Sequence, residues 1–165
     1  MTDSSPASLL NAHPLVSMRF RPAWTYIDGI REFGEFFCRT TFEDPEIADR
    51  ACIIIQETLE NAVKYSSGDS SNELELVIKA TSSLIEFSVI STPNREHLDA
   101  LQLELRQLND MDPEAAFMAA LQRAEREPNA SARLGLARMR YEAAVELLLE
   151  DTQDGRIRFT ARGKL

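Results

Sequence analysis

Residues 52–68, CIIIQETLENAVKYSSG, join a strongly apolar beginning to three polar residues, Glu57, Asn61 and Lys64. An α-helix advances about 100° per residue, so these three residues fall on one side of a helix, within about 60° of one another. The opposite side carries the apolar residues expected to face the core, Cys52, Ile55, Leu59, Ala62 and Val63. Because Ile53 and Ile54 lie on or beside the polar side, the stretch predicts a helix that forms the floor of a cleft.

The sequence around this helix predicts an α+β domain. Asp44 can cap the helix and Pro45 suits its first position, so the helix is expected from about residue 45 to 65. Asp112 and Pro113 predict another helix start in the same way. Hydrophobic periodicity predicts strands at residues 15–20, 74–80, 84–91 and 154–163. It also predicts a helix at residues 23–42, an insert of helices at about 95–127, and a helix from about 131 through Leu147. This order predicts a two-layer α/β sandwich with helices on one face of a mostly antiparallel mixed sheet.

The length, charge and composition of the chain argue against several classes of function. The chain has 165 residues, enough for one domain with a sizeable core, and a net charge of −9 argues against nonspecific nucleic-acid binding. No apolar run approaches the length that crosses a membrane. Residues 1–14 have neither a basic start nor a continuous apolar segment, so we expect a flexible tail on a cytoplasmic protein. Cys38, Cys52, His13 and His97 do not form a convincing zinc set, and the cysteines are expected to be inert buried thiols.

Two patterns have more than one interpretation. Arg133, Arg138 and Arg140 cluster near Gly135, which is typical of a solvated basic edge and secondly of a site for an anion or an acidic partner. The insert carries a leucine stripe at helical spacing, which is either core packing or a surface for a protein partner. The stripe consists of Leu98, Leu101, Leu105 and Leu108.

The segment ETLENAVKY, residues 57–65, resembles the N-box of the GHKL, or histidine-kinase-like, ATPases. The order of elements from about residue 15 onward is also similar, so the resemblance implies one Bergerat-type domain over residues 15–165, with the helical insert in the position of the ATP lid. The chain looks closest to the anti-sigma-factor serine-kinase and SiaB-type branch, whose members act on STAS-domain partners.

This resemblance implies roles for the polar face of the helix. Asn61 would bind the Mg²⁺ ion that bridges the phosphates of ATP, Glu57 would act as the catalytic base, and Lys64 would contact phosphate oxygens. The chemistry is consistent with the residue types, because Mg²⁺ prefers oxygen ligands and phosphoryl transfer depends on positioning and charge neutralisation.

Two later motifs depart from the family pattern. The Asp-x-Gly-x-Gly box is replaced by FSVISTPNREH, residues 87–97, in which Asn94 could bind adenine or simply cap the next helix. The glycine-rich box is reduced to Gly135, and Arg133 stands where a second glycine is expected. Arg133 could contact phosphate or lie on the surface, and Gly135 could present amides to phosphate or permit close packing.

Three functions are therefore considered. The first is a regulatory protein serine/threonine kinase or switch protein of the anti-sigma type that binds Mg-ATP and acts on a STAS-like partner. The second is a degenerate member that no longer binds ATP and serves as a protein-interaction module. A phosphatase or phosphotransfer partner is a weaker third, because no histidine lies in a phosphoacceptor-like helix pattern. Neither nucleic acid nor membrane is an expected partner, and a homodimer stays open.

Overall fold

The structure is a computed structural model that describes residues 15–66, 72–81, 83–126 and 131–164. The expected N-terminal tail, residues 1–14, lies outside the described residues. Along the chain the elements are β1 (Val16–Phe20), α2 (Trp24–Thr41), α3 (Pro45–Tyr65), β2 (Leu74–Ala80), β3 (Leu84–Ser91), α4 (Arg95–Asn109), α5 (Pro113–Arg126), α6 (Ser131–Glu142), β4 (Glu146–Asp151) and β5 (Ile157–Lys164).

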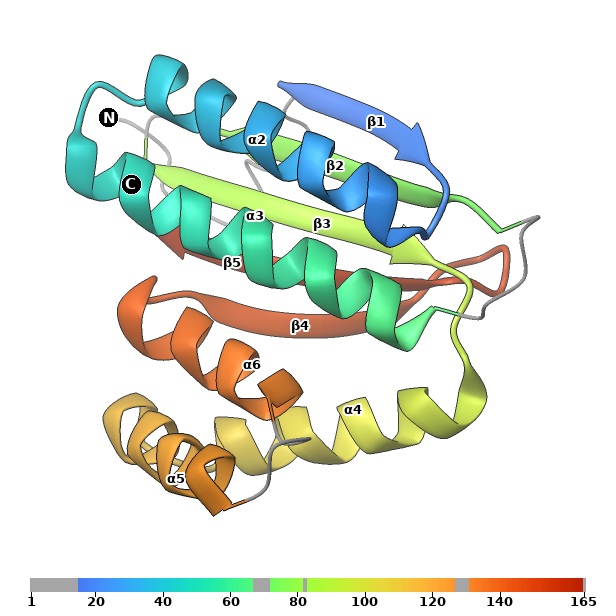
Figure 1. Cartoon of the computed structure of the whole chain (residues 1–165), viewed down its shortest axis with the longest axis vertical. Helices are drawn as coiled ribbons and strands as arrows, with labels where there is room; N and C mark the ends of the chain where they lie inside the picture. Colours follow the sequence, from blue (N-terminus) through green and yellow to red (C-terminus); the bar gives the residue numbers. More distant parts are fainter. Residues whose placement is uncertain (1–14, 67–71, 82, 127–130, 165) are drawn as a thin grey trace.

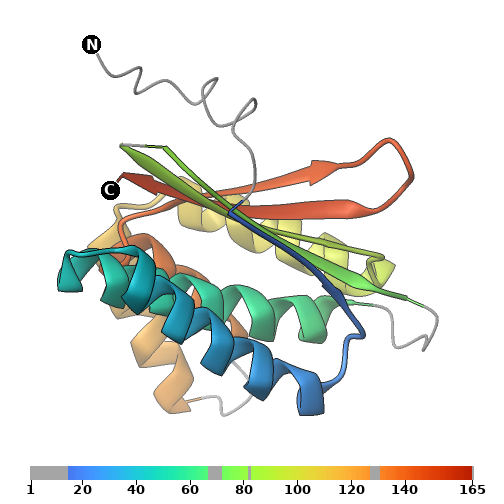
Figure 2. The ribbon, with the colours of Figure 1, turned by 90° about the horizontal axis from the view of Figure 1, so that it is seen from above.

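The strands form one sheet in the order β1-β2-β3-β5-β4, and every neighbouring pair is antiparallel. On one face of the sheet α2 and α3 lie side by side, α6 follows toward β4, and α4 and α5 lie beyond α6 (Figure 1). The view from above shows the sheet as one layer and the helices as the other (Figure 2). The expected two-layer α/β sandwich is confirmed, although its sheet has five strands among the described residues and is wholly antiparallel rather than mixed.

The fifth strand lies where the sequence predicted a continuing helix. Helix α6 ends at Glu142, Ala144 adopts a positive φ of 52°, and β4 then pairs with β5. This pairing places Leu147 opposite Ala161 and buries it. A short leucine run suits either a helix or a strand, and here the tertiary pairing decides. The prediction that Leu147 belongs to a helix was therefore wrong.

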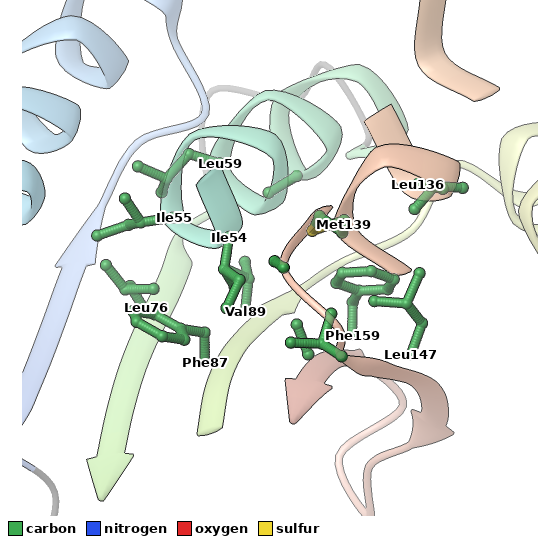
Figure 3. Close-up of a cluster of buried hydrophobic side chains, with 14 of the residues drawn as sticks. Ile54, Ile55, Leu59, Leu76, Phe87, Val89, Leu136, Met139, Leu147 and Phe159 are labelled. Carbon is green, nitrogen blue, oxygen red and sulfur yellow. The ribbon is translucent and has the colours of Figure 1, made fainter. Parts of the chain in front are cut away.

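Helix α3 lies at the centre of the hydrophobic core. Ile54, Ile55 and Leu59 of α3 pack with side chains from the sheet and from α6 (Figure 3). Ile54 is only 2% exposed, so the prediction that it forms an apolar wall beside a cleft was wrong. The core extends to both sides of α3 because α2 and α6 flank it. Gly34 allows the close approach of α2, since a Cβ there would lie 2.1 Å from Ile55 Cδ1.

The helical insert is packed against the rest of the domain. Leu101, Leu105 and Leu108 of α4 are buried and belong to the same core cluster as α3 and the sheet. Most of the leucine stripe therefore serves core packing rather than an exposed surface. Among the described residues, no helix is both long and apolar enough to cross a membrane.

Candidate functional site

The polar residues of α3 lie within the fold rather than on a solvated face. Asp44 Oδ1 accepts a hydrogen bond from Glu46 N at 2.9 Å and so fixes the start of the helix. More than three turns beyond this cap, Asn61 is 4% exposed, while the side chains of Glu57 and Lys64 are 12% and 29% exposed. Asn61 is therefore buried, while Glu57 and Lys64 on the same side of α3 remain partly exposed.

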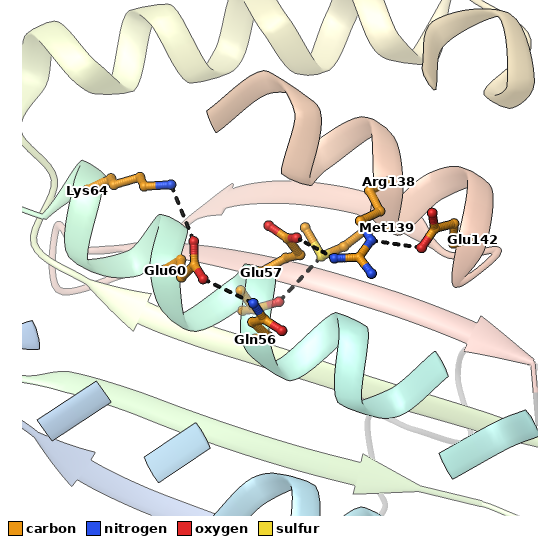
Figure 4. A network of polar contacts seen from close by, with 8 residues as sticks. Gln56, Glu57, Glu60, Lys64, Arg138, Met139 and Glu142 are labelled. Carbon is orange, nitrogen blue, oxygen red and sulfur yellow. Dashed lines mark hydrogen bonds and ion pairs between the residues drawn. The ribbon is translucent and has the colours of Figure 1, made fainter. Parts of the chain in front are cut away.

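Glu57 is held by helix α6. Arg138 Nη1 lies 3.5 Å from Glu57 Oε1, and Arg138 Nε donates a 2.7 Å hydrogen bond to Glu142 (Figure 4). Gly135, one turn earlier on α6, allows the carboxylate to lie against the helix backbone, because a Cβ at Gly135 would be 2.1 Å from Glu57 Oε2. The carboxylate expected to act as a catalytic base is thus an anchor for α6.

Burial raises the pKa of Glu57 above its usual value of 4.5, and the nearby carboxylate of Glu60 adds to the shift, while Arg138 and Lys64 oppose it. A carboxyl group whose pKa is raised in the folded state binds its proton more tightly there than in the unfolded chain. Ionised Glu57 is therefore unfavourable to folding at a pH above its folded pKa. As the pH falls from there toward 4.5, the group takes up its proton in the folded state, and the free energy of unfolding rises.

Glu57→Gln is accordingly expected to stabilise the protein at neutral pH, and this gain should shrink as the pH is lowered toward 4.5. Thermal melts of the variant and of the unmodified chain across that range measure the difference. Glu46→Gln, in the exposed first turn of the same helix and away from Glu57, is the control and should not reproduce the trend. A gain for Glu57→Gln that grows on acidification would contradict the assigned direction.

Asn61 lines a small pocket. Its Nδ2 is buried and has no hydrogen-bond partner among the described residues. The pocket has a volume of about 20 Å³, which is room for about one water molecule. Its lining comes from α3, β3, α4 and β5 and consists of Thr58, Asn61, Ala62, Tyr65, Val89, Ser91, Leu101, Ile157 and Phe159. Side chains therefore reduce the predicted cleft over Asn61 to a small, partly open pocket, to which α4 contributes Leu101.

The three arginines near Gly135 bind three different parts of the chain. Arg138 contacts Glu57 of α3, and Arg133 Nε lies 3.6 Å from the buried carboxylate of Glu104 on α4. Arg140 donates to the carbonyl oxygens of Leu108 and of Met111, at the end of α4. The side chains of Arg133 and Arg138 are 48% and 37% exposed, so this edge is solvated as well as paired. The three residues form an arginine clamp (Arg133, Arg138 and Arg140) that fastens α6 to its neighbours.

Arg133 of the arginine clamp pairs with a carboxylate that is largely removed from solvent, that of Glu104. Burial raises the pKa of this carboxyl group, and the cations Arg133 and Arg123 oppose the shift. Removing a partner from a buried charge costs more than removing one from a solvated pair. The insert is thus attached to α6 through both apolar packing and an ion pair between the half-exposed Arg133 and the buried carboxylate of Glu104.

The two other predicted ligand residues have local roles. Lys64 Nζ lies 3.5 Å from Glu60 Oε2, one turn back on α3, in the network that also includes Gln56 (Figure 4). Asn94 caps α4, because its Oδ1 accepts a hydrogen bond from Glu96 N at 3.1 Å. The N–H of Asn94 also donates to the carbonyl of Tyr65 at 3.0 Å, which ties the start of α4 to the end of α3.

Mg-ATP does not fit the site in this arrangement. The amide of Asn61 and the carboxylate of Glu57 are suitable oxygen donors, but the space beside Asn61 holds about one water molecule and Glu57 faces Arg138. No group of three or more His, Cys, Asp or Glu residues within the described ranges is arranged to hold a metal ion. We derive no phosphoryl-transfer step from this geometry.

The sequence singled out Leu101 and Arg138 without placing them near the polar residues of α3, and it gave no role to Glu104. In the structure Leu101 lines the pocket at Asn61, Arg138 pairs with Glu57, and Glu104 pairs with Arg133. Each carried a weak signal. Leu101 belongs to a stripe typical of core packing, and Glu104 is an acidic residue between two leucines on the same helix. Arg138 lies three residues after Gly135, one turn along the same helix face, so both could meet a single side chain of a neighbouring helix.

Comparisons with known proteins support the fold of this chain and assign no family to it. No family model and no curated protein matches this sequence. Among solved structures, the chain is similar to a chain in the crystal structure of the SiaB–SiaC complex from Pseudomonas aeruginosa, with a TM-score of 0.69 and 17% sequence identity. The match covers 96% of this chain and 95% of that chain. This likeness shows the same α/β sandwich over nearly the whole length, and it agrees with the fold that the resemblance to SiaB-type proteins implied.

Proposed function

We propose that this chain is a signalling regulator that acts by binding a protein partner, and that its own side chains fill the position where related ATPases would bind nucleotide. The observation that carries this proposal is the small size of the pocket at Asn61, which has a volume of about 20 Å³ and is lined in part by Leu101 of α4. The arginine clamp supports it, because the same helix that covers Glu57 also fastens the insert.

The partner class comes from the resemblance. Anti-sigma-type proteins act on STAS-domain partners, and we assign a STAS-like protein as the partner of this chain. The similar fold in the SiaB–SiaC structure comes from a complex of two proteins, which supports a protein rather than a small molecule as the binding partner. The net charge of −9 favours a partner with a basic surface.

A second candidate, a Mg-ATP-dependent serine/threonine kinase, rests on two observations at the same place. Asn61 has a buried amide nitrogen without a partner, and burial raises the pKa of Glu57 on the preceding turn. Unsatisfied buried groups and shifted pKa values concentrate at functional sites. For this activity α4 and α6 would have to move away from α3, which would free Glu57 from Arg138.

Titration calorimetry of the full chain with ATP and Mg²⁺ separates the two candidates. The proposed function predicts no binding up to millimolar ATP. Micromolar binding that Asn61→Ala abolishes, with an unchanged melting temperature, would establish the kinase candidate instead. Gln56→Ala is the matched control, since Gln56 lies on the same helix and bonds Glu60 outside the cavity.

A further inference from the structure

The two cysteines of the chain lie on neighbouring helices. Cys38 belongs to α2 and is fully buried, as the sequence predicted, whereas Cys52 belongs to α3 and is only partly buried. Both are free thiols, and both pack with the hydrophobic core. Neither lines the pocket at Asn61, so their chemistry is separate from the proposed function.

Contacts between α2 and α3 place the two cysteines level with each other. The helices lie side by side (Figure 1), and the short connection between them makes them antiparallel. Gly34 of α2 meets Ile55 of α3, and Arg39 of α2 forms a 2.8 Å ion pair with Asp49 of α3. On each helix the cysteine lies between these two contacts. The cysteines are therefore level to within about two residues, which is about 3 Å along the helix axis.

The close approach of α2 and α3 suits a bond between the two sulfur atoms. Packed helices have axes about 8–10 Å apart and Cα atoms about 2.3 Å from each axis, so directly facing residues have Cα atoms roughly 3–6 Å apart. Gly34, one turn before Cys38, favours the short end of this range. The partial exposure of Cys52 turns it to one side of the contact, which adds to the distance. Cα atoms about 4.4–6.8 Å apart are suitable for a disulfide.

We infer that Cys38 and Cys52 are a reversible disulfide site that joins α2 to α3 when the protein meets a small disulfide oxidant. The partly exposed Cys52 reacts first: its thiolate attacks one sulfur atom of the oxidant, and the other half of the oxidant leaves as a thiolate. Cys38 then attacks the sulfur of Cys52 and releases the second half. Each leaving thiolate takes up the proton that a protein thiol has lost. The two protein thiols are thereby oxidised by two electrons, and the oxidant is reduced to two thiols.

The surroundings of the two thiols set the rate of this exchange. Burial raises the pKa of Cys52, Arg39 opposes the shift, and the carboxylates of Glu35 and Asp49 add to it. Burial also raises the pKa of Cys38 to about 12, and the thiolate of Cys52 adds to that shift. The mixed disulfide removes this thiolate and its repulsion before the second step. Because the thiolate is the attacking species, the exchange should be slow at neutral pH and speed up about tenfold per pH unit below the pKa of Cys52.

Intact-mass measurement of the full chain after incubation with glutathione disulfide at about pH 8.5 tests this inference. We expect each chain to lose two hydrogen atoms, and dithiothreitol to reverse the loss. Trypsin should then release residues 32–39 joined to residues 51–64, since each of these segments follows Arg and ends in Arg or Lys. A chain that remains fully reduced, that keeps one glutathione on Cys52, or that forms disulfides only between chains overturns the inference.

Two variants separate the steps. Cys38→Ser should stop at the mixed disulfide, so its mass increases by one glutathione group on Cys52. Cys52→Ser should not react, because Cys38 is fully buried and is reached only through Cys52. A glutathione group on Cys38 in the Cys52→Ser variant would contradict the assigned order. The measurement on the unmodified chain decides the inference even if a variant does not fold.

Discussion

Leu101→Ala is expected to lower the free energy of unfolding by about 2–5 kcal/mol, the range for a fully packed leucine in a core. Leu101 of α4 is 3% exposed and lines the pocket at Asn61 together with Ile157 and Phe159 of β5. Its truncation enlarges the cavity beside Asn61, so part of the cost is the empty volume. Urea unfolding monitored by circular dichroism measures the change.

Leu103→Ala is the matched control for this prediction. Leu103 lies two residues further along the same helix and is 56% exposed, so its truncation should cost no more than about 0.5 kcal/mol. A similar small cost for both variants would mean that α4 is not packed against the domain. The insert would then be free to act as a lid, as the resemblance to ATPases first implied.

Gly34→Ala is expected to destabilise the protein by about 1–3 kcal/mol through overpacking, even though alanine is the better helix former by about 1 kcal/mol. The added Cβ would lie 2.1 Å from Cδ1 of Ile55, which is fully buried, so either Ile55 changes its rotamer within a packed core or α2 and α3 move apart. Unfolding curves of the variant measure the loss.

Ile55→Val removes the atom that clashes, and this makes the prediction specific. Alone, Ile55→Val should cost about 0.5–1.5 kcal/mol, as is usual for a buried methyl group. In the Gly34→Ala background it should cost nothing or restore stability, which gives a coupling energy of about 1 kcal/mol or more. Strictly additive losses would show that the close approach of α2 does not depend on Gly34.

Local chemistry explains why most elements could be predicted. Asp44 and Asp112 each precede a proline and accept hydrogen bonds from the first helical amides, so both helix starts follow from a few neighbouring residues. In the hairpin, β2 alternates clearly before a short polar turn, and β3 after it is a mainly apolar run that is buried almost throughout. β4 was missed because its leucine run has no decisive period, and its strand structure depends on pairing with β5.

The sequence indicated which residues of α3 share one side of the helix, but it did not indicate which other side chains cover that side. The periodicity of one helix correctly placed Glu57 and Asn61 on a common side. It carries no information about what covers that side, and the covering groups Leu101 and Arg138 come from elements 40 and 77 residues after Asn61 in the chain. Whether the space is an open cleft or a small pocket is a property of tertiary packing, which the pattern of one helix does not contain.

Amide hydrogen exchange of α4 tests the central claim that the insert is packed over Asn61. The account predicts slow exchange for the inward-facing turns of α4 around Leu101, Leu105 and Leu108, at a level close to that of α3, and the same rates with and without Mg-ATP. Rapid exchange throughout α4 in the free protein, or protection that appears only when Mg-ATP is added, would contradict it.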